Sequence, residues 1–397
     1  MIRLSERLRQ LPGYPLAEIP TIKRRLIEAG VDVIDLGAGD NDTPPPAPVV
    51  QALTEALLDP ALSKYGFQQG LADFRRAASD YVARRFGHRF DPQAEILPLI
   101  GSKEGLAHLP FALVNQGDVV VLPEPGYQAY IGGAILSGAE PFVYPLTARE
   151  GFLLELDRLS ADVLARTRLV YLNYPNNPTA AVAPLDYLER TVHACRRHGI
   201  VLAYDNAYCD LTFDGYRAPS IFDIDGANEV AVEFLSLSKS FSMTGWRLGF
   251  AVGKRELVGA LSKIKSYIDT GPFLAIQKAG VVALDRAEEF VEPIRLELAR
   301  RRDAGVRALR TRGFEIESPR AAMYLWVPLP PGIASAAFTR FALESEGVVT
   351  LPGSGFGPAG EGYFRIALTV GADRLEEAIG RLGKALISFD AGVPATA

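Results

Sequence analysis

The sequence predicts an α/β protein with a large domain built on a mostly parallel, seven-stranded sheet between helices and a smaller α+β domain. Short, continuous apolar runs alternate with helical patterns between about residues 95 and 252, which is typical of a sheet buried on both faces. Beyond about residue 254 the pattern becomes helical, and residues 287–312 form one long charged helix. The 397 residues, of which 48% are hydrophobic, are enough for two domains.

The expected elements follow the chain in this order. Residues 1–30 contain one or two short helices interrupted by prolines, and residues 31–36 form a strand. The seven strands of the large sheet are expected at residues 96–100, 119–122, 141–144, 168–173, 200–204, 230–236 and 248–252. Helices are expected at residues 102–114, 127–137 and 184–198. The last part should hold strands near 314–317, 323–328, 348–351 and 363–368, and helices near 334–346 and 372–388.

These patterns predict three segments. Residues 1–44 form an N-terminal arm and part of the small domain, residues 45–286 form the large domain, and residues 287–397 form the C-terminal small domain. The long charged helix at 287–312 is the expected hinge between the two domains.

Composition and charge exclude several classes of function. A net charge of −5 gives no reason to expect a nucleic-acid partner or an anionic membrane. Neither the two cysteines nor the four histidines fit a metal, redox or Ser-His-Asp pattern, so no metal is expected. The N-terminus lacks the apolar core of a signal peptide, and no apolar run approaches a membrane span. A reducing cytoplasm is the simplest expected location.

The stretch from residue 234 to 250 carries the strongest chemical signal. It presents Lys239 after Ser236 and Ser238 and before Ser240 and Ser242, and Arg247 follows in the same stretch. Hydroxyl groups and a guanidinium can bind a phosphate, and a lysine beside such a pocket suggests a Schiff base with a phosphorylated carbonyl cofactor, for which pyridoxal 5'-phosphate is the obvious candidate.

This stretch allows two other interpretations. Lys239 and Arg247 could be solvated side chains on a loop. Ser236 and Lys239 also fit the S-x-x-K pattern of penicillin-binding proteins and β-lactamases, but the K-T-G and S-D-N elements that those enzymes need are missing.

Other polar residues follow the ends of the predicted strands, where open α/β sheets bind ligands. Ser102 begins a helix after a glycine, so the helix N-terminus and the hydroxyl can bind an anion. Tyr127 opens the next helix and could stack on a pyridine ring. Asp205 ends an apolar strand, where a buried carboxylate needs a cationic partner such as a protonated pyridine nitrogen. Tyr208 could donate a hydrogen bond to the ring oxygen.

The order Ser-x-Ser-Lys followed by Gly-Trp-Arg-x-Gly resembles the cofactor-lysine segment of the class I/II aminotransferases, the fold type I enzymes that depend on pyridoxal phosphate. This resemblance assigns Lys239, Asp205 and Tyr208 as catalytic residues. Asn177 lies in a segment similar to the family's Asn-Pro-Thr-Gly element, with Ala180 in place of the glycine, and should bind the cofactor's ring hydroxyl and the substrate. By the same match, Arg365 should bind the substrate α-carboxylate.

Residues 99–108, 173–178 and 353–365 resemble the LL-diaminopimelate aminotransferases. The resemblance implies amino transfer between LL-2,6-diaminopimelate and 2-oxoglutarate by a ping-pong mechanism through pyridoxamine phosphate. It implies that Tyr14, Gly39, Tyr65 and Lys103 are further contacts: Tyr14 and Gly39 to substrate, Lys103 to cofactor, and Tyr65 to both. In this family the residue at Tyr65 reaches the phosphate of the other subunit, which implies a homodimer with shared active sites.

The preferred amino donor remains open at this point. Gln69 stands where relatives often carry a glutamate that can pair with a substrate ammonium. The alternatives are an aminotransferase for N-succinyl-diaminopimelate, aspartate or alanine, or a C–S lyase on the same fold. A regulator on this fold would need an appended DNA-binding domain, for which no residues are spare.

Overall fold

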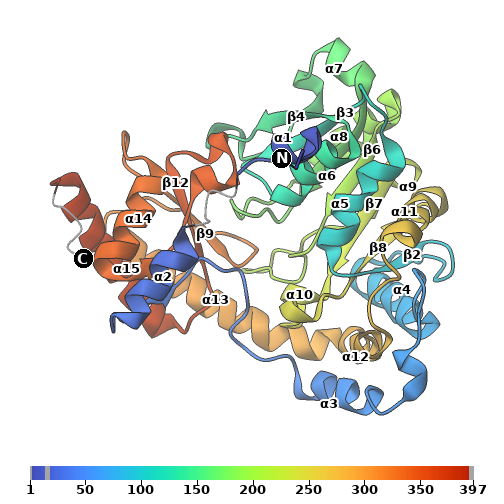
Figure 1. Cartoon of the computed structure of the whole chain (residues 1–397), viewed down its shortest axis with the longest axis horizontal. Coiled ribbons are helices and arrows are strands. Elements are labelled where there is room, and N and C mark those ends of the chain that lie inside the picture. Colours follow the sequence, from blue (N-terminus) through green and yellow to red (C-terminus); the bar gives the residue numbers. More distant parts are fainter. Residues whose placement is uncertain (1, 14–17, 393–397) are drawn as a thin grey trace.

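The computed structural model describes residues 2–13 and 18–392, and its central feature is a seven-stranded sheet (Figure 1). The strands are β2 (Ile96–Leu99), β3 (Val119–Glu124), β4 (Glu140–Pro145), β5 (Thr167–Asn173), β6 (Val201–Asp205), β7 (Ala231–Ser236) and β8 (Gly249–Gly253). They lie in the order β2-β8-β7-β6-β5-β3-β4, and within this sheet only β8 runs antiparallel to its neighbours. The predicted mostly parallel sheet is therefore confirmed.

Helices cover both faces of this sheet, which explains why its strands are apolar without alternation. Val170 and Leu172 of β5 pack in one buried cluster, whereas Leu169 and Tyr171 pack in another on the opposite face. The first cluster includes residues of α4 (Ala72–Phe86), α8 (Leu185–His198) and α12 (Leu274–Asp285). The second includes residues of α5 (Ser102–Leu113), α6 (Gln128–Ser137) and α11 (Arg255–Ile268).

A smaller α+β unit lies beside the large one, on the left of Figure 1. Its antiparallel sheet has the order β11-β12-β9, and β1 pairs in parallel with β10. The elements are β1 (Ile34–Asp35), β9 (Tyr324–Pro328), β10 (Val348–Val349), β11 (Leu351–Pro352), β12 (Tyr363–Ala367), α2 (Ile19–Glu28), α14 (Ser335–Glu346) and α15 (Ala372–Asp390). The long helix α13 (Ala287–Thr311) runs between the two units (Figure 1). The exact boundaries at residues 44 and 286 stay a prediction.

Three of the predicted strands differ from the structure. Residues 314–317 form no strand, because Ile316 uses its carbonyl to accept hydrogen bonds from the Arg310 side chain while Phe314 packs into the core. Apolar and charged residues alternate there as they do in a half-buried strand, but the segment does not pair with a neighbouring strand in the described part of the chain. Of the strand expected at residues 31–36, only β1 (Ile34–Asp35) forms. The strand expected at 348–351 divides, because the chain leaves β1 after Val349 and joins β12 at Leu351.

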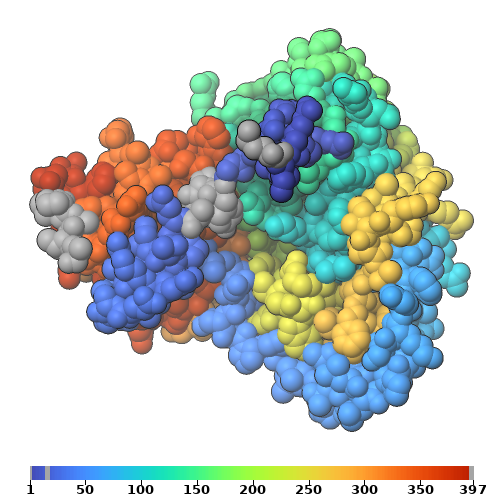
Figure 2. Space-filling model, in the orientation of Figure 1, coloured from blue at the N-terminus to red at the C-terminus, as the bar shows by residue number. Residues whose placement is uncertain are grey.

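The N-terminal segment contacts both units. Helix α1 (Glu6–Gln10) lies on the large unit, where Arg7 Nη1 donates to the Leu136 carbonyl at 3.0 Å, and α2 lies on the small unit (Figure 2). Pro20 falls in the first turn of α2, where a missing N–H costs nothing. Tyr14 lies outside the described residues. In the described part of the chain, no helix has the length and apolar content that a membrane crossing requires.

Candidate active site

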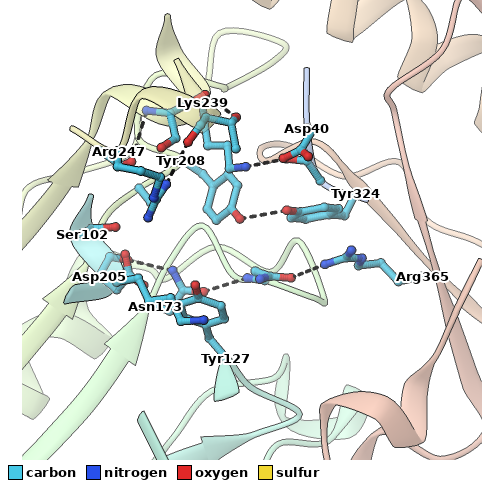
Figure 3. Close-up of a pocket in the computed structure, with 17 residues that line it drawn as sticks. Asp40, Ser102, Tyr127, Asn173, Asp205, Tyr208, Lys239, Arg247, Tyr324 and Arg365 are labelled. Carbon is cyan, nitrogen blue, oxygen red and sulfur yellow. Dashed lines mark hydrogen bonds between the residues drawn. The ribbon is translucent and has the colours of Figure 1, made fainter. Parts of the chain in front are cut away.

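A cavity of about 440 Å³ opens at the edge of the large sheet where β5, β6 and β7 end, next to β9 and β12 of the small unit (Figure 3). Its lining residues are Gly39, Asp40, Ser102, Lys103, Tyr127, Asn173, Asn177, Asp205, Ala207, Tyr208, Ser236, Ser238, Lys239, Thr244, Arg247, Tyr324 and Arg365. They come from segments far apart in the sequence, and most of them are polar.

Lys239 enters this cavity from a single helical turn. Strand β7 ends at Ser236, whose hydroxyl accepts from the Ser238 N–H at 3.2 Å and so begins α10 (Leu237–Ser240). The half-buried Lys239 donates from Nζ to the carbonyl of Gly39. On the other side of the turn, Asn41 Nδ2 donates to the Lys239 carbonyl at 3.0 Å. The amine is therefore held facing the cavity.

One end of the cavity has the chemistry of an anion site. Ser102 is the first residue of α5, and Gly101 before it has a φ of 69°. A Cβ on Gly101 would lie 2.3 Å from Nη2 of Arg247, so only glycine lets the guanidinium approach the helix terminus. Arg247 Nη1 donates to the Thr244 carbonyl at 2.9 Å, which fixes the side chain. Helix N–H groups, hydroxyls and a guanidinium thus converge.

Asp205 is the buried carboxylate of the site. It is 5% exposed, and its Oδ2 accepts from the Tyr130 hydroxyl at 2.7 Å, while Oδ1 is buried without a partner. Asn173 Nδ2 donates to the Asp205 carbonyl at 2.8 Å and so fixes the end of β6 against β5. Burial raises the pKa of Asp205 to about 6, while the Tyr130 hydrogen bond opposes this shift. An unpaired Oδ1 in a ligand-sized cavity is a position for a cationic N–H.

Arg365 and two tyrosines form the opposite wall. Arg365 donates from Nη1 to Asn177 Oδ1 at 2.8 Å and from Nη2 to the Gly37 carbonyl at 2.6 Å, whereas its buried Nε has no partner. Its guanidinium lies 4.2 Å from the ring centre of Tyr324. The hydroxyls of Tyr208 and Tyr324 are hydrogen-bonded at 2.9 Å, and burial raises the pKa of Tyr208 well above its ordinary value.

Tyr127 presents its ring on the remaining wall. It packs edge-on against Tyr130, with ring centres 5.7 Å apart, and the Lys103 ammonium lies 5.6 Å from its ring centre. Burial and the nearby Asp205 raise the pKa of Tyr127 above its ordinary value, so the phenol stays neutral.

Of the residues to which the sequence assigned a catalytic or binding role, the structure brings together all but Tyr65 and Tyr14. Tyr65 does not line the cavity and is 75% exposed, and Tyr14 is not described. The lining also contains five residues for which no role was expected from the sequence: Asp40, Asn173, Ala207, Thr244 and Tyr324. Asn173, the last residue of β5, could have been found from its position at a strand end.

Residues 31–382 match the sequence profile of the family described as aminotransferase class I and II. The chain belongs to this family. The LL-diaminopimelate aminotransferase of Moorella thermoacetica is 44% identical to this aminotransferase. The aligned region covers 96% of this chain and 98% of the relative. That of Aquifex aeolicus is 45% identical, with coverage of 96% and 99%. A solved structure described as a probable N-succinyldiaminopimelate aminotransferase from Thermus thermophilus is 39% identical, with a TM-score of 0.89 over 94% of this chain and 100% of that chain.

These matches confirm the predicted fold type I architecture, the enzyme class and the dependence on pyridoxal phosphate. The cavity of this aminotransferase fits that cofactor on its own features. The unpaired Oδ1 of Asp205 suits a protonated ring nitrogen, and the Ser102–Arg247 end suits a phosphate. Glycine at position 101 leaves the space that the guanidinium needs.

A second polar cluster lies behind the N-terminus of α5 in this aminotransferase. Glu104, His108 and Asp269 offer atoms close enough together for a cation. The buried Lys265 ammonium lies 2.6 Å from Glu104 Oε2 and 3.0 Å from Asp269 Oδ1, so a protein cation already pairs with both carboxylates.

Proposed function

We propose that this aminotransferase moves an amino group between LL-2,6-diaminopimelate and 2-oxoglutarate in a ping-pong reaction. The observation that carries the proposal is the 44% identity, over 96% of the chain, to an enzyme named for that donor. The site supports it chemically, because its cavity of about 440 Å³ holds a lysine, a buried carboxylate and a buried arginine together.

We infer the following roles for the residues that hold the cofactor. The α5 N-terminus with Ser102, together with Ser236, Ser238 and Arg247, holds the phosphate. Asp205 Oδ1 accepts from the ring nitrogen and keeps it protonated. Tyr208 and Asn177 donate to the ring oxygen, Tyr127 packs against the ring, and Lys103 lies beside Tyr127. When bound, pyridoxal phosphate supplies an electron sink for negative charge at the substrate Cα.

Lys239 is the proposed base. With pyridoxal phosphate bound, its Nζ would be the point of covalent attachment, and the free amine would take the proton from the substrate Cα and later return it. The Gly39 carbonyl, which accepts from Nζ in this structure, orients the amine toward the cavity.

Arg365 is the proposed binding residue for the α-carboxylate of every substrate, and Arg365→Lys is the variant that tests it. A guanidinium keeps donors for a carboxylate even while it holds Asn177 and Gly37, whereas a lysine cannot reproduce this fork. We expect kcat/KM for amino acids to fall by roughly 10–100-fold, the worth of one or two charged hydrogen bonds. Amines without a carboxylate should react at unchanged rates, as measured by stopped-flow absorbance of the bound cofactor. An equal loss for both classes would contradict the role.

A panel of amino donors tests the substrate. Each donor is mixed with the holoenzyme in the absence of an oxo acid, and the conversion of the cofactor is followed by absorbance. We expect LL-diaminopimelate to react with the highest kcat/KM, ahead of aspartate and alanine, because the distal ammonium and carboxylate need a polar pocket to replace their water. A faster reaction with aspartate or alanine would refute this substrate and leave the aminotransferase assignment intact.

N-succinyl-diaminopimelate is the second candidate donor, because the similar Thermus thermophilus structure carries a name with that substrate. Succinylation removes the distal ammonium and adds a carboxylate, so the two donors differ by two charges at the distal end. Including both in the same panel decides between them, since a pocket that matches one leaves the other with an unpaired charge.

We further propose that the enzyme acts in the cytoplasm as a homodimer in which Tyr65 serves the neighbouring site. Tyr65 is 75% exposed and Phe67 is 64% exposed, and neither lines the cavity of its own chain. Gln69 is also exposed and outside the cavity, so its contact with a substrate would require a second copy. In a symmetric dimer, these exposed rings would form an apolar contact surface that the second copy covers.

A further inference from the structure

The turn that carries Lys239 rests on a buried carboxylate outside the cavity. Asp210 is 7% exposed, and its Oδ2 accepts from the Ser240 hydroxyl at 2.7 Å and from the Tyr81 hydroxyl at 2.6 Å. Its Oδ1 accepts from Nε of Arg85 at 3.1 Å. None of these four residues lines the active-site cavity, yet Ser240 is the residue directly after Lys239.

This turn has little stability of its own. Helix α10 has four residues, too few for a helix to persist without outside contacts. Ser242, just beyond it, has a φ of 55°, a conformation that an L-residue adopts only when its surroundings impose it. The N-terminal segment ties the turn at one point, where Asn41 Nδ2 donates to the Lys239 carbonyl at 3.0 Å and to Ser242 Oγ at 3.1 Å. The Ser240–Asp210 bond ties the turn to the large unit at a second point.

Asp210 is suited to hold the turn rigidly. Its charge is neutralised by Arg85, whose side chain is 17% exposed and whose Nη2 donates to the Cys209 carbonyl at 2.7 Å. Both oxygens of the carboxylate have partners, so the network has few alternative arrangements. Three donors from two different helices fix its position, two from α4 and one from α10.

We propose that Asp210 is a positioning residue for the reaction, and that it acts through Ser240 to fix the direction in which Lys239 presents its amine. The proposal rests on the proposed role of Lys239. A catalytic base must lie within hydrogen-bond reach of the proton it removes, so a small rotation of α10 lowers the rate of proton transfer without changing how the substrate binds.

Two matched variants separate positioning from stability. Ser240→Ala and Tyr81→Phe each remove one hydroxyl donor from the same Oδ2, but only Ser240 belongs to the turn of Lys239. We expect Ser240→Ala to lower the half-reaction kcat about tenfold with KM within about twofold, and to shift the pH midpoint of the visible absorbance of the lysine–cofactor link. Tyr81→Phe should lower Tm by about as much as Ser240→Ala does. It should keep kcat within about twofold of wild type and leave the pH midpoint unchanged. Equal losses of kcat in both variants would overturn the proposal.

A second cavity permits a rescue experiment. It has a volume of about 300 Å³, lies against α13, and is lined by Asp210, Arg85 and Tyr81 among others. Asp210→Ala would leave the Arg85 guanidinium facing the space vacated by the carboxylate. We expect Asp210→Ala to lose more rate than Ser240→Ala, and formate to restore part of it by replacing the carboxylate. Ser240→Ala should show no gain with formate, because its carboxylate is still present. Equal stimulation of both variants would count against Asp210.

The readouts keep this proposal separate from the proposed function. The half-reaction is measured with whichever donor reacts fastest, so a wrong substrate does not affect the comparison. Borohydride reduction followed by peptide mapping reports whether Lys239 carries the cofactor, which is the part on which the proposal rests. If Asp210→Ala does not fold, the comparison of Ser240→Ala with Tyr81→Phe still decides, because both leave the carboxylate in place.

Discussion

Lys239→Ala should abolish the covalent attachment of the cofactor and slow the half-reaction by about 10⁴-fold or more, the largest loss expected from a single substitution in this enzyme. The reason is that Lys239 has two proposed tasks, and no other side chain in the described cavity can take over both. Lys103 also lines the cavity, but its ammonium lies over the ring of Tyr127, 5.6 Å from the ring centre.

The measurement is mass spectrometry of peptides after borohydride reduction, together with single-turnover absorbance. Wild type should carry the reduced cofactor on the peptide that contains Lys239, and the alanine variant should release it on denaturation. Lys103→Ala is the matched control: it removes another cavity lysine and should keep the link on Lys239, with a weaker affinity for the cofactor. Finding the reduced cofactor on Lys103 or Lys265 in wild type would refute the assignment.

The sequence predicted the part of the site that follows the strands of the large sheet. Parallel strands end at one edge, so residues directly after apolar runs, such as Asp205 and Lys239, must lie near one another once the sheet forms. The same logic covers Ser102, because β2 runs in the direction of β7 and its following helix begins at that edge. Here local pattern and three-dimensional position agree.

The small unit contributes residues that no local pattern identifies. Tyr324 is the first residue of β9 and reads as an ordinary core aromatic, yet its hydroxyl reaches Tyr208, 116 positions earlier. Gly39 is required because a Cβ there would lie 2.4 Å from the Tyr324 hydroxyl, a contact that depends on how the two units pack. Arg365 was identified by family resemblance, and its bonds to Asn177 and Gly37 appear only in the folded chain.

Asp205→Asn should show the second largest effect, because Asp205 is the only partner the described cavity offers to a protonated ring nitrogen at Oδ1. The asparagine keeps an oxygen that can accept from the Tyr130 hydroxyl and removes the negative charge. We expect the half-reaction rate to fall about 10²–10³-fold, the loss typical of one preorganised electrostatic partner in a buried site. Tyr130→Phe, which keeps the charge and removes the hydrogen bond, is the control and should lose much less.

Asp205→Asn should also stabilise the cofactor-free protein, by an amount that depends on pH. The pKa of Asp205 rises from 3.8 to about 6 on folding, so the folded protein binds the extra proton more tightly than the unfolded chain. The stability that this proton contributes is fully present below about pH 4 and is lost as the pH rises through about 6. A difference of two pKa units between the folded and unfolded states corresponds to roughly 2–3 kcal/mol in the free energy of unfolding.

We therefore expect cofactor-free Asp205→Asn to have a higher Tm than cofactor-free wild type at pH 8, and no higher Tm at pH 4.5. Adding the cofactor should reverse the order at pH 8, because a cation opposite Oδ1 stabilises the carboxylate of the wild type and cannot stabilise the amide equally. Differential scanning calorimetry at both pH values, with and without cofactor, measures all of these differences. A gain in Tm that is the same at both pH values would show that the buried charge is not its cause. An unchanged Tm shift on cofactor binding would show that Asp205 does not contact the ring nitrogen.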